Sequence, residues 1–90
     1  MAWKDYLGQR VIIQSNEGPA EVGTLVGVEA WHSKDFPIVT KDSDGIEYVV
    51  MGILLPYRQD ILDTLNSMPH LQAWEFCVGF SRLTQARFAR

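Results

Sequence analysis

The residue types that can hold a metal ion or attack a substrate are few in this chain and widely spaced. His32, His70 and Cys77 are the candidate zinc ligands, but the gaps between them match no compact zinc motif and no second cysteine is present. The run His32-Ser33-Lys34-Asp35 contains residue types of a catalytic triad. Neighbours in sequence, however, rarely align a nucleophile, a base and an orienting group. We therefore expect no metal site, no cofactor and no triad.

The acidic run Asp42-Ser43-Asp44-Gly45 is similar to the start of a calcium loop, but Glu47 comes too early to supply the closing glutamate. A hairpin turn accounts for the run better. The chain also lacks a phosphate-cradling glycine-rich loop and a hydrolase nucleophile elbow. The sequence thus predicts a protein that is not an enzyme, and an enzyme subunit that binds a small molecule is the least favoured alternative.

The best candidate ligand-binding residues are Trp31, His32, Lys34 and Phe36, within residues 30–37. They combine stacking surfaces with a donor and a cation, as single-stranded nucleic-acid sites do. We expect residues 30–37 to form a loop. The alternative is that Trp31 and Phe36 cap an open barrel end or fill an interface between subunits.

Charge is divided unevenly along the chain. Residues 1–75 carry eleven acids against five lysines or arginines, a net charge of −6, whereas residues 76–90 carry Arg82, Arg87 and Arg90 and no acid. The total of −3 excludes a general polyanion binder, so any contact with RNA must be local. Arg82 and Arg87 are candidate phosphate contacts. Alternatively, the basic tail bridges to acidic neighbours in an assembly.

Ninety residues, 47% of them hydrophobic, suffice for one small domain. About five strands are predicted in the first 57 residues, at 11–14, 21–29, 38–40, 47–51 and 53–57. In the second, alternation places Gly23, Leu25 and Gly27 on one face, and two glycines on one face suggest a sharp bend or a close neighbour. We predict a mainly β fold, a small five-stranded SH3-like or Sm-like barrel over residues 1–57.

Residues 58–90 are expected to form an extension packed on the same domain. A helix over about 57–68 is indicated by the stripe Ile61, Leu62, Leu65 and Met68, and Pro69 ends it. Farther on, Trp74, Phe76, Val78 and Phe80 alternate with smaller or polar residues, which favours a strand through Phe80 and a short helix or tail after Ser81. Phe76, Phe80, Leu83 and Arg87 also fit one helical face. We interpret Cys77 as a small core residue.

Two stretches resemble the Sm-like RNA-binding family, over roughly residues 3–57. Residues 6–29 contain Leu7-Gly8, then Gly18 and Val22-Gly23-Thr24-Leu25, with Glu29 where the family has an aspartate. The run Val50-Met51-Gly52-Ile53-Leu54 stands where the family has isoleucine-arginine-glycine-asparagine. The resemblance implies a short N-terminal helix, a homo-oligomeric ring and an RNA site that includes Met51 and Gly52. Because Met51 and Ile53 replace the family's arginine and asparagine, it implies a ring more strongly than RNA binding.

Assembly is also favoured by a nearly continuous apolar stretch. It comprises Val49, Val50, Met51, Ile53, Leu54 and Leu55. Such a run implies burial on both faces, one against the chain's own core and the other against the extension or another subunit. We therefore expect a homo-oligomeric ring with single-stranded RNA as a candidate partner. The alternative is a structural or protein-interaction barrel that has lost nucleic-acid binding.

The chain shows no membrane-length apolar run, since the longest such stretch, 49–56, is far below the roughly 20 residues of a membrane helix. Its first residues carry no signal-peptide pattern, and a lone cysteine agrees with a reducing compartment. The expected location is the cytoplasm.

Overall fold

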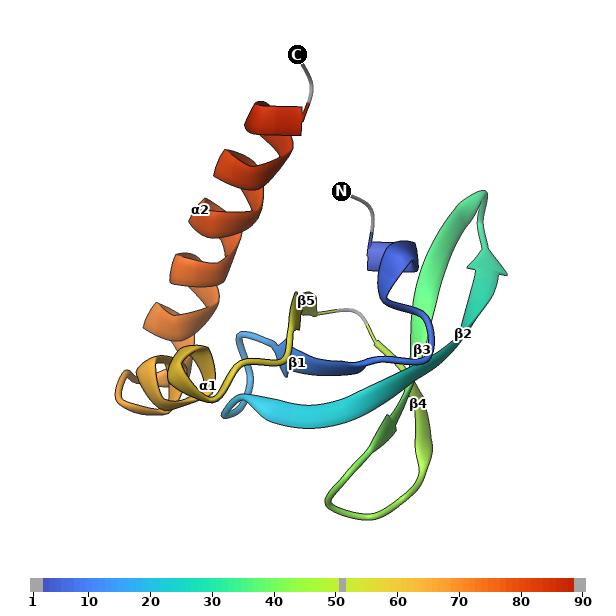
Figure 1. Cartoon of the computed structure of the whole chain (residues 1–90), viewed down its shortest axis with the longest axis horizontal. Helices are drawn as coiled ribbons and strands as arrows, with labels where there is room; N and C mark the ends of the chain where they lie inside the picture. The colour runs from blue at the N-terminus through green and yellow to red at the C-terminus, as the bar shows by residue number, and fades with distance from the viewer. Residues whose placement is uncertain (1–2, 51, 89–90) are drawn as a thin grey trace.

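A computed structural model describes the backbone of residues 3–50 and 52–88 and the side chains of residues 3–50 and 52–79. In chain order its elements are a 3-10 helix η1 (Trp3–Tyr6), strands β1 (Arg10–Gln14), β2 (Glu21–Trp31), β3 (Lys34–Lys41), β4 (Glu47–Val49) and β5 (Ile53–Pro56), and helices α1 (Gln59–Asn66) and α2 (His70–Phe88). Figure 1 shows the two helices at one end of the sheet and the long β2–β3 hairpin at the other.

The five strands form one antiparallel sheet in the order β4-β3-β2-β1-β5. Neighbouring strands in the chain also neighbour each other in space up to β4, and β5 then crosses over to pair with β1. The mainly β character and the number of strands are confirmed. The sheet is open, with β4 and β5 as its two edges, so the closure expected of a barrel is not observed.

Two hydrophobic clusters lie on opposite faces of the sheet. The inner cluster contains Val11, Ile13, Leu25, Val39 and Val50, with Trp3, Tyr6 and Leu54 packed against it. The outer cluster contains Ile12, Leu55, Leu65, Ala73 and Cys77 and joins β1 and β5 to the two helices. Strand β1 is therefore buried on both faces, because adjacent side chains on a strand point in opposite directions.

A β-bulge in β2 changes which residues share a face. Leu25 lies opposite Val39 whereas Gly27 lies opposite Ile38, so the register shifts at Val26. Directly opposed residues point to the same face, and Val39 and Ile38 alternate, so Leu25 faces inward and Gly27 outward. The prediction that Gly23, Leu25 and Gly27 share one face was wrong. The extra residue at the bulge interrupts the alternation of side chains between the two faces of the sheet.

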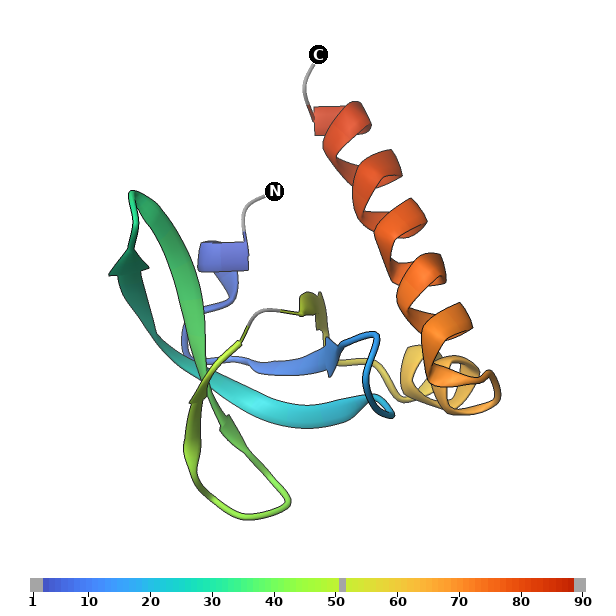
Figure 2. The ribbon, with the colours of Figure 1, turned by 180° about the vertical axis from the view of Figure 1, so that it is seen from behind.

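The segment 30–37, expected to be a loop, is instead the end of a hairpin. Strand β2 continues to Trp31, β3 begins at Lys34, and these two residues pair across a two-residue turn. The ladder is long because each of the residues 28–31 finds a partner in 34–37. Figure 2 shows β2 and β3 running side by side to the end of this long hairpin.

The prediction of a strand through Phe80 was wrong. This segment is part of helix α2, which runs from His70 to Phe88. Ala73 and Cys77, one turn apart, are fully buried against β1 and β5, so burial follows the helical period rather than the two-residue one. Helix α1 is confirmed within slightly narrower bounds, and the predicted stripe lies in or beside the outer cluster. No helix in the described part of the chain is long and apolar enough to cross a membrane.

Candidate nucleic-acid or protein interface

The far end of the β2–β3 hairpin carries four of the predicted binding residues. The turn consists of His32 and Ser33, with φ values of +49° and +63°. Two residues with positive φ form the type I′ geometry whose twist matches the flanking strands, and this turn normally favours asparagine and glycine. The hairpin therefore ends tightly, with Trp31 and Lys34 directly opposite each other.

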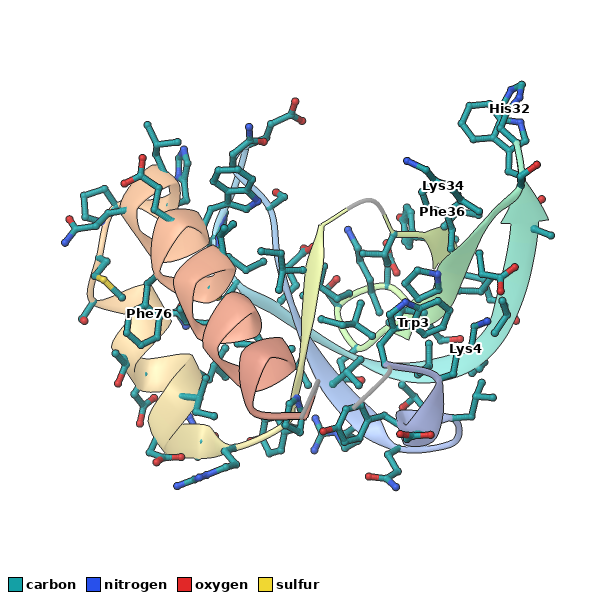
Figure 3. All side chains as sticks on the ribbon, turned by 90° about the horizontal axis from the view of Figure 1, so that it is seen from above. Trp3, Lys4, His32, Lys34, Phe36 and Phe76 are labelled. Carbon is teal, nitrogen blue, oxygen red and sulfur yellow. The ribbon has the colours of Figure 1, made fainter. Side chains whose placement is uncertain are left out.

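Three aromatic side chains gather at this end. The Trp31 ring lies 4.4 Å from the His32 ring in an edge-to-face arrangement and 6.0 Å from the Phe36 ring. Trp31 is 54% exposed, whereas Phe36 is partly covered. Figure 3 shows His32 at the extreme end, with Lys34 and Phe36 following along β3. Within one chain Trp31 therefore does not fill a core, and its surface is free to meet another molecule.

Below the aromatic end lies a small hollow of about 180 Å³. Its lining comprises Trp3, Asp35, Phe36, Pro37, Val50, Gly52 and Leu54. This volume is below the 300–1,000 Å³ typical of small-molecule sites. The hollow brings together Phe36 and Gly52, two predicted site residues that are distant in sequence.

Two residues of η1 belong to this region and were not predicted. Trp3 lines the hollow, and the Lys4 ammonium group pairs with the Asp35 carboxylate on β3. Lys4 also lies 5.9 Å from the Trp3 ring centroid. Figure 3 places both side chains beside the hairpin. The only signal for them in the sequence was a tryptophan-lysine pair in the short helix that the resemblance implied.

The remaining predicted RNA-binding residues are not brought to the hairpin by the described structure. Met51 lies outside the described residues. Arg82 and Arg87 lie in the last part of α2, where only the backbone is described. Helix α2 is at the opposite end of the sheet from the hairpin in Figures 1 and 2.

A separate group of charged side chains surrounds the β3–β4 turn. The Tyr48 hydroxyl donates a 2.5 Å hydrogen bond to Asp44, which lowers the pKa of the carboxyl and raises that of the phenol. The Lys41 ammonium group lies 2.7 Å from Glu21, which raises the pKa of Lys41, and 4.3 Å from the Tyr48 ring centroid. These contacts give the shifted pKa values of Asp44, Tyr48 and Lys41 a structural cause.

The predicted hairpin turn at 42–45 is confirmed, since these residues connect β3 to β4 and Gly45 has a φ of +68°. His32, His70 and Cys77 do not meet, because His32 lies in the β2–β3 turn, His70 is the first residue of α2 and Cys77, farther along α2, is buried against the sheet. In the described part of the chain no three side chains of metal-ligating type come together.

No protein-family model, curated protein or solved structure matches the chain.

Proposed function

We propose that the chain is a non-enzymatic, Sm-like assembly module that joins copies of itself edge to edge into a closed ring. The observation that carries this proposal is the pair of unlike edges, β4 and β5, of one antiparallel sheet. A short helix followed by five strands is also the element order that the resemblance implies. Pairing two unlike edges is a head-to-tail contact, which closes into a ring when the rotation per subunit fits.

The backbone geometry defines what each edge offers. The Val50 N–H donates to Pro37 on β3, so alternation points the backbone groups of Glu47 and Val49 away from β3. Likewise the Tyr57 N–H donates to Arg10 on β1, so Leu54 and Pro56 point their backbone groups away from β1. Each edge therefore offers backbone partners for a strand of another copy.

The apolar residues predicted for the interface divide between the chain's own core and its surface. Val50 and Leu55 are buried within the chain, in the inner and outer clusters respectively. Val49 is 44% exposed, and Ile53 and Leu54 are partly exposed. An interface formed by β4 and β5 would therefore rest on Val49, Ile53 and Leu54, with Met51 outside the described residues.

The test is a substitution that removes one outward donor. Val49→Pro deletes the N–H that points away from β3, while Val49→Thr keeps that N–H in a side chain of similar shape. We expect the wild type and Val49→Thr to share one oligomeric mass in light scattering, and Val49→Pro to have a lower mass. A monomeric wild type at micromolar concentration, or an unchanged mass for Val49→Pro, would contradict edge pairing.

A second candidate function is local binding of single-stranded RNA at the hairpin end. The specific observation that favours it is the exposed Trp31 ring beside His32 and Phe36, with the Lys34 cation opposite. Base stacking on an aromatic ring contributes about 1–3 kcal/mol per base. Lys34 has no ion-pair partner among the described residues and can approach a phosphate.

Fluorescence anisotropy with short U-rich and A-rich RNAs at low salt tests this second function. We expect Trp31→Ala to weaken binding at least fivefold, as loss of one stacking surface requires. Ile46→Ala, which removes an exposed apolar side chain from the β3–β4 turn, should leave binding unchanged. If the wild type binds neither RNA at about 10⁻⁴ M protein, the structural or protein-interaction alternative without nucleic acid is favoured.

A further inference from the structure

One half of the outer face of the sheet carries apolar side chains that nothing in the described chain covers. Helices α1 and α2 cover the β1–β5 half through the outer cluster. On the β2–β3–β4 half, cross-strand register places Gly27, Ile38 and Val49 in one row, Glu29 and Phe36 in the next, and Trp31 and Lys34 in the last. We define the bare strip as Trp31, Phe36, Ile38 and Val49, together with Val26, the bulge residue next to Gly27 in β2.

The exposure of the bare strip is substantial for a small domain. Val26 is 46% exposed, Val49 44% and Trp31 54%, whereas Phe36 and Ile38 are partly covered by their neighbours. Along β2 the strip runs from Gly27 to Trp31, about 14 Å at the rise of a strand. Contiguous exposed apolar side chains of this kind mark a surface that is covered in an assembly.

Helix α2 also exposes an apolar side chain that the described chain leaves uncovered. It is anchored by Ala73 and Cys77, yet Phe76 is 48% exposed and lies on the side of α2 away from the sheet (Figure 3). Phe76 also begins the helical face predicted from the sequence, which continues to Arg87 over about 16 Å at the rise of an α-helix. A helix with apolar residues on more than one side needs a second surface on which to bury them.

Charge distinguishes α2 of a second copy from other occupants. Helix α2 contains Arg82 and Arg87 in its last part, and its one acid is Glu75, directly before Phe76, whereas the bare strip is flanked on the same face by Glu29 and Glu47. Neither glutamate has an ion-pair partner among the described residues. A basic, apolar helix therefore matches this strip in length, polarity and sign of charge.

We propose that the bare strip of one copy receives α2 of a second copy, with the reciprocal contact formed at the same time. Such a contact is two-fold symmetric and uses the same pair of surfaces in both partners. It is distinct from edge pairing, because it uses side chains on a face of the sheet rather than the backbone groups of the sheet edges, and Val49 is the residue that the two contacts share. The protein thus has two self-association surfaces, one at the strand edges and one across the sheet face.

Photo-crosslinking between isotopically distinct copies tests the contact directly. Benzoylphenylalanine replaces Phe76 in an equal mixture of ¹⁴N and ¹⁵N full-length chains, and tryptic peptides are identified after irradiation. The bare strip falls in peptides 11–34, 35–41 and 42–58. We expect mixed-isotope crosslinks from position 76 to peptides 11–34 and 35–41. Crosslinks within single chains only, or mixed crosslinks only between two α2 helices, would overturn the proposal.

Three variants separate this contact from edge pairing and from a general effect of charge. Glu29→Arg should lower the mixed-isotope yield about three- to fivefold, whereas Glu17→Arg, with the same charge change in the β1–β2 loop, should leave it unchanged. Val49→Pro should retain the crosslinks even if it abolishes a ring, since it keeps an apolar side chain in the strip. Loss of the crosslinks in Val49→Pro, or equal effects of the two Glu→Arg variants, would overturn the independent contact.

Discussion

His32 and Ser33 adopt the backbone conformation that residues with a Cβ atom adopt least readily. Their φ values of +49° and +63° are in the left-handed region, which costs roughly 1–2 kcal/mol for each such residue. The cross-strand pairs between 28–31 and 34–37 hold them there. A strained turn that carries an exposed aromatic group agrees with a role for these side chains in binding rather than in folding.

Replacing the two turn residues should therefore stabilise the fold. We expect His32→Asn combined with Ser33→Gly, the preferred type I′ pair, to raise the free energy of unfolding by about 1–2 kcal/mol. Chemical denaturation followed by far-UV circular dichroism measures the change. Ser43→Gly, in the other hairpin turn and without a positive φ to relieve, is the control. A midpoint equal to or below that of the wild type would show that the turn is not strained.

The bulge in β2 separates two glycines that look equivalent in sequence. A Cβ atom on Gly23 would come within 2.5 Å of Val39 Cγ1 and 2.6 Å of the Thr40 carbonyl oxygen, whereas one on Gly27 would meet Ile38 Cδ1 at an ordinary 3.6 Å. We expect Gly23→Ala to destabilise the protein by about 1–3 kcal/mol through overpacking. Gly27→Ala should change stability by less than about 1 kcal/mol. Urea unfolding of both variants measures the difference, and equal effects would contradict the bulge.

At the scale of elements, the sequence predicted the β-branched strands well and the amphipathic segments less well. Strands β1 and β5 were expected almost where they lie, because apolar and β-branched runs with turn residues at their ends have few alternatives. The end of α2 was ambiguous because Trp74, Phe76, Val78 and Phe80 satisfy a two-residue period, while burial of Ala73 and Cys77 decides for the helix. Packing against β1 depends on the tertiary structure, so the spacing of apolar residues within the segment cannot reveal it.

The candidate site was predictable only where its residues are contiguous in sequence. Trp31, His32, Lys34 and Phe36 were found because they are close together and unusual in type for a loop. The approach of η1 to β3, which brings Trp3 and Lys4 to Asp35, depends on how the sheet bends and was missed.

The hydrogen bond in the β3–β4 turn leads to a prediction about the titration of Asp44. The pKa of Asp44 is lowered chiefly by the hydrogen bond from Tyr48, so its contribution to stability is present above the unfolded-state pKa, about 3.9, and is lost as pH falls through the lower folded-state pKa. We expect Tyr48→Phe to move the Asp44 titration midpoint upward, measured by carboxyl NMR shifts. An unmoved Asp44 midpoint would contradict the hydrogen bond.

The burial of Cys77 in α2 leads to a prediction about the reactivity of its thiol. Burial raises the pKa of the Cys77 thiol to about 11, and the side chain is fully enclosed in the outer cluster. At pH 8 we expect the native thiol to react with a disulfide reagent at least about a hundredfold more slowly than in the unfolded chain, because both the thiolate fraction and its access are reduced. Absorbance of the released thiol measures the rate, and the single cysteine makes the signal unambiguous. Similar rates in native and unfolded protein would show that α2 is detached.

At the scale of the whole molecule, β1 is the element that links the two halves of the structure. Val11 and Ile13 belong to the inner cluster, whereas Ile12 belongs to the outer cluster with the helices, and all three are buried. Strand β1 also pairs with two partners, β2 and β5. The outer cluster can therefore be weakened without removing the contacts that hold β1 to β2 and the inner cluster.

This arrangement predicts a graded order of local stability, because regions with fewer buried contacts open more easily. Leu65 is 1% exposed in the outer cluster, so Leu65→Ala should cost about 2–5 kcal/mol. In native-state hydrogen exchange we expect this variant to lose protection first in α1 and α2, with the amides that join β1 to β2 the last to exchange. Met68→Ala, at the partly buried margin of the same cluster, should show the same order with a smaller loss. If the helices and β1 lost protection equally in both variants, the two faces would form one cooperative unit, and β1 would not be the separable centre of the fold.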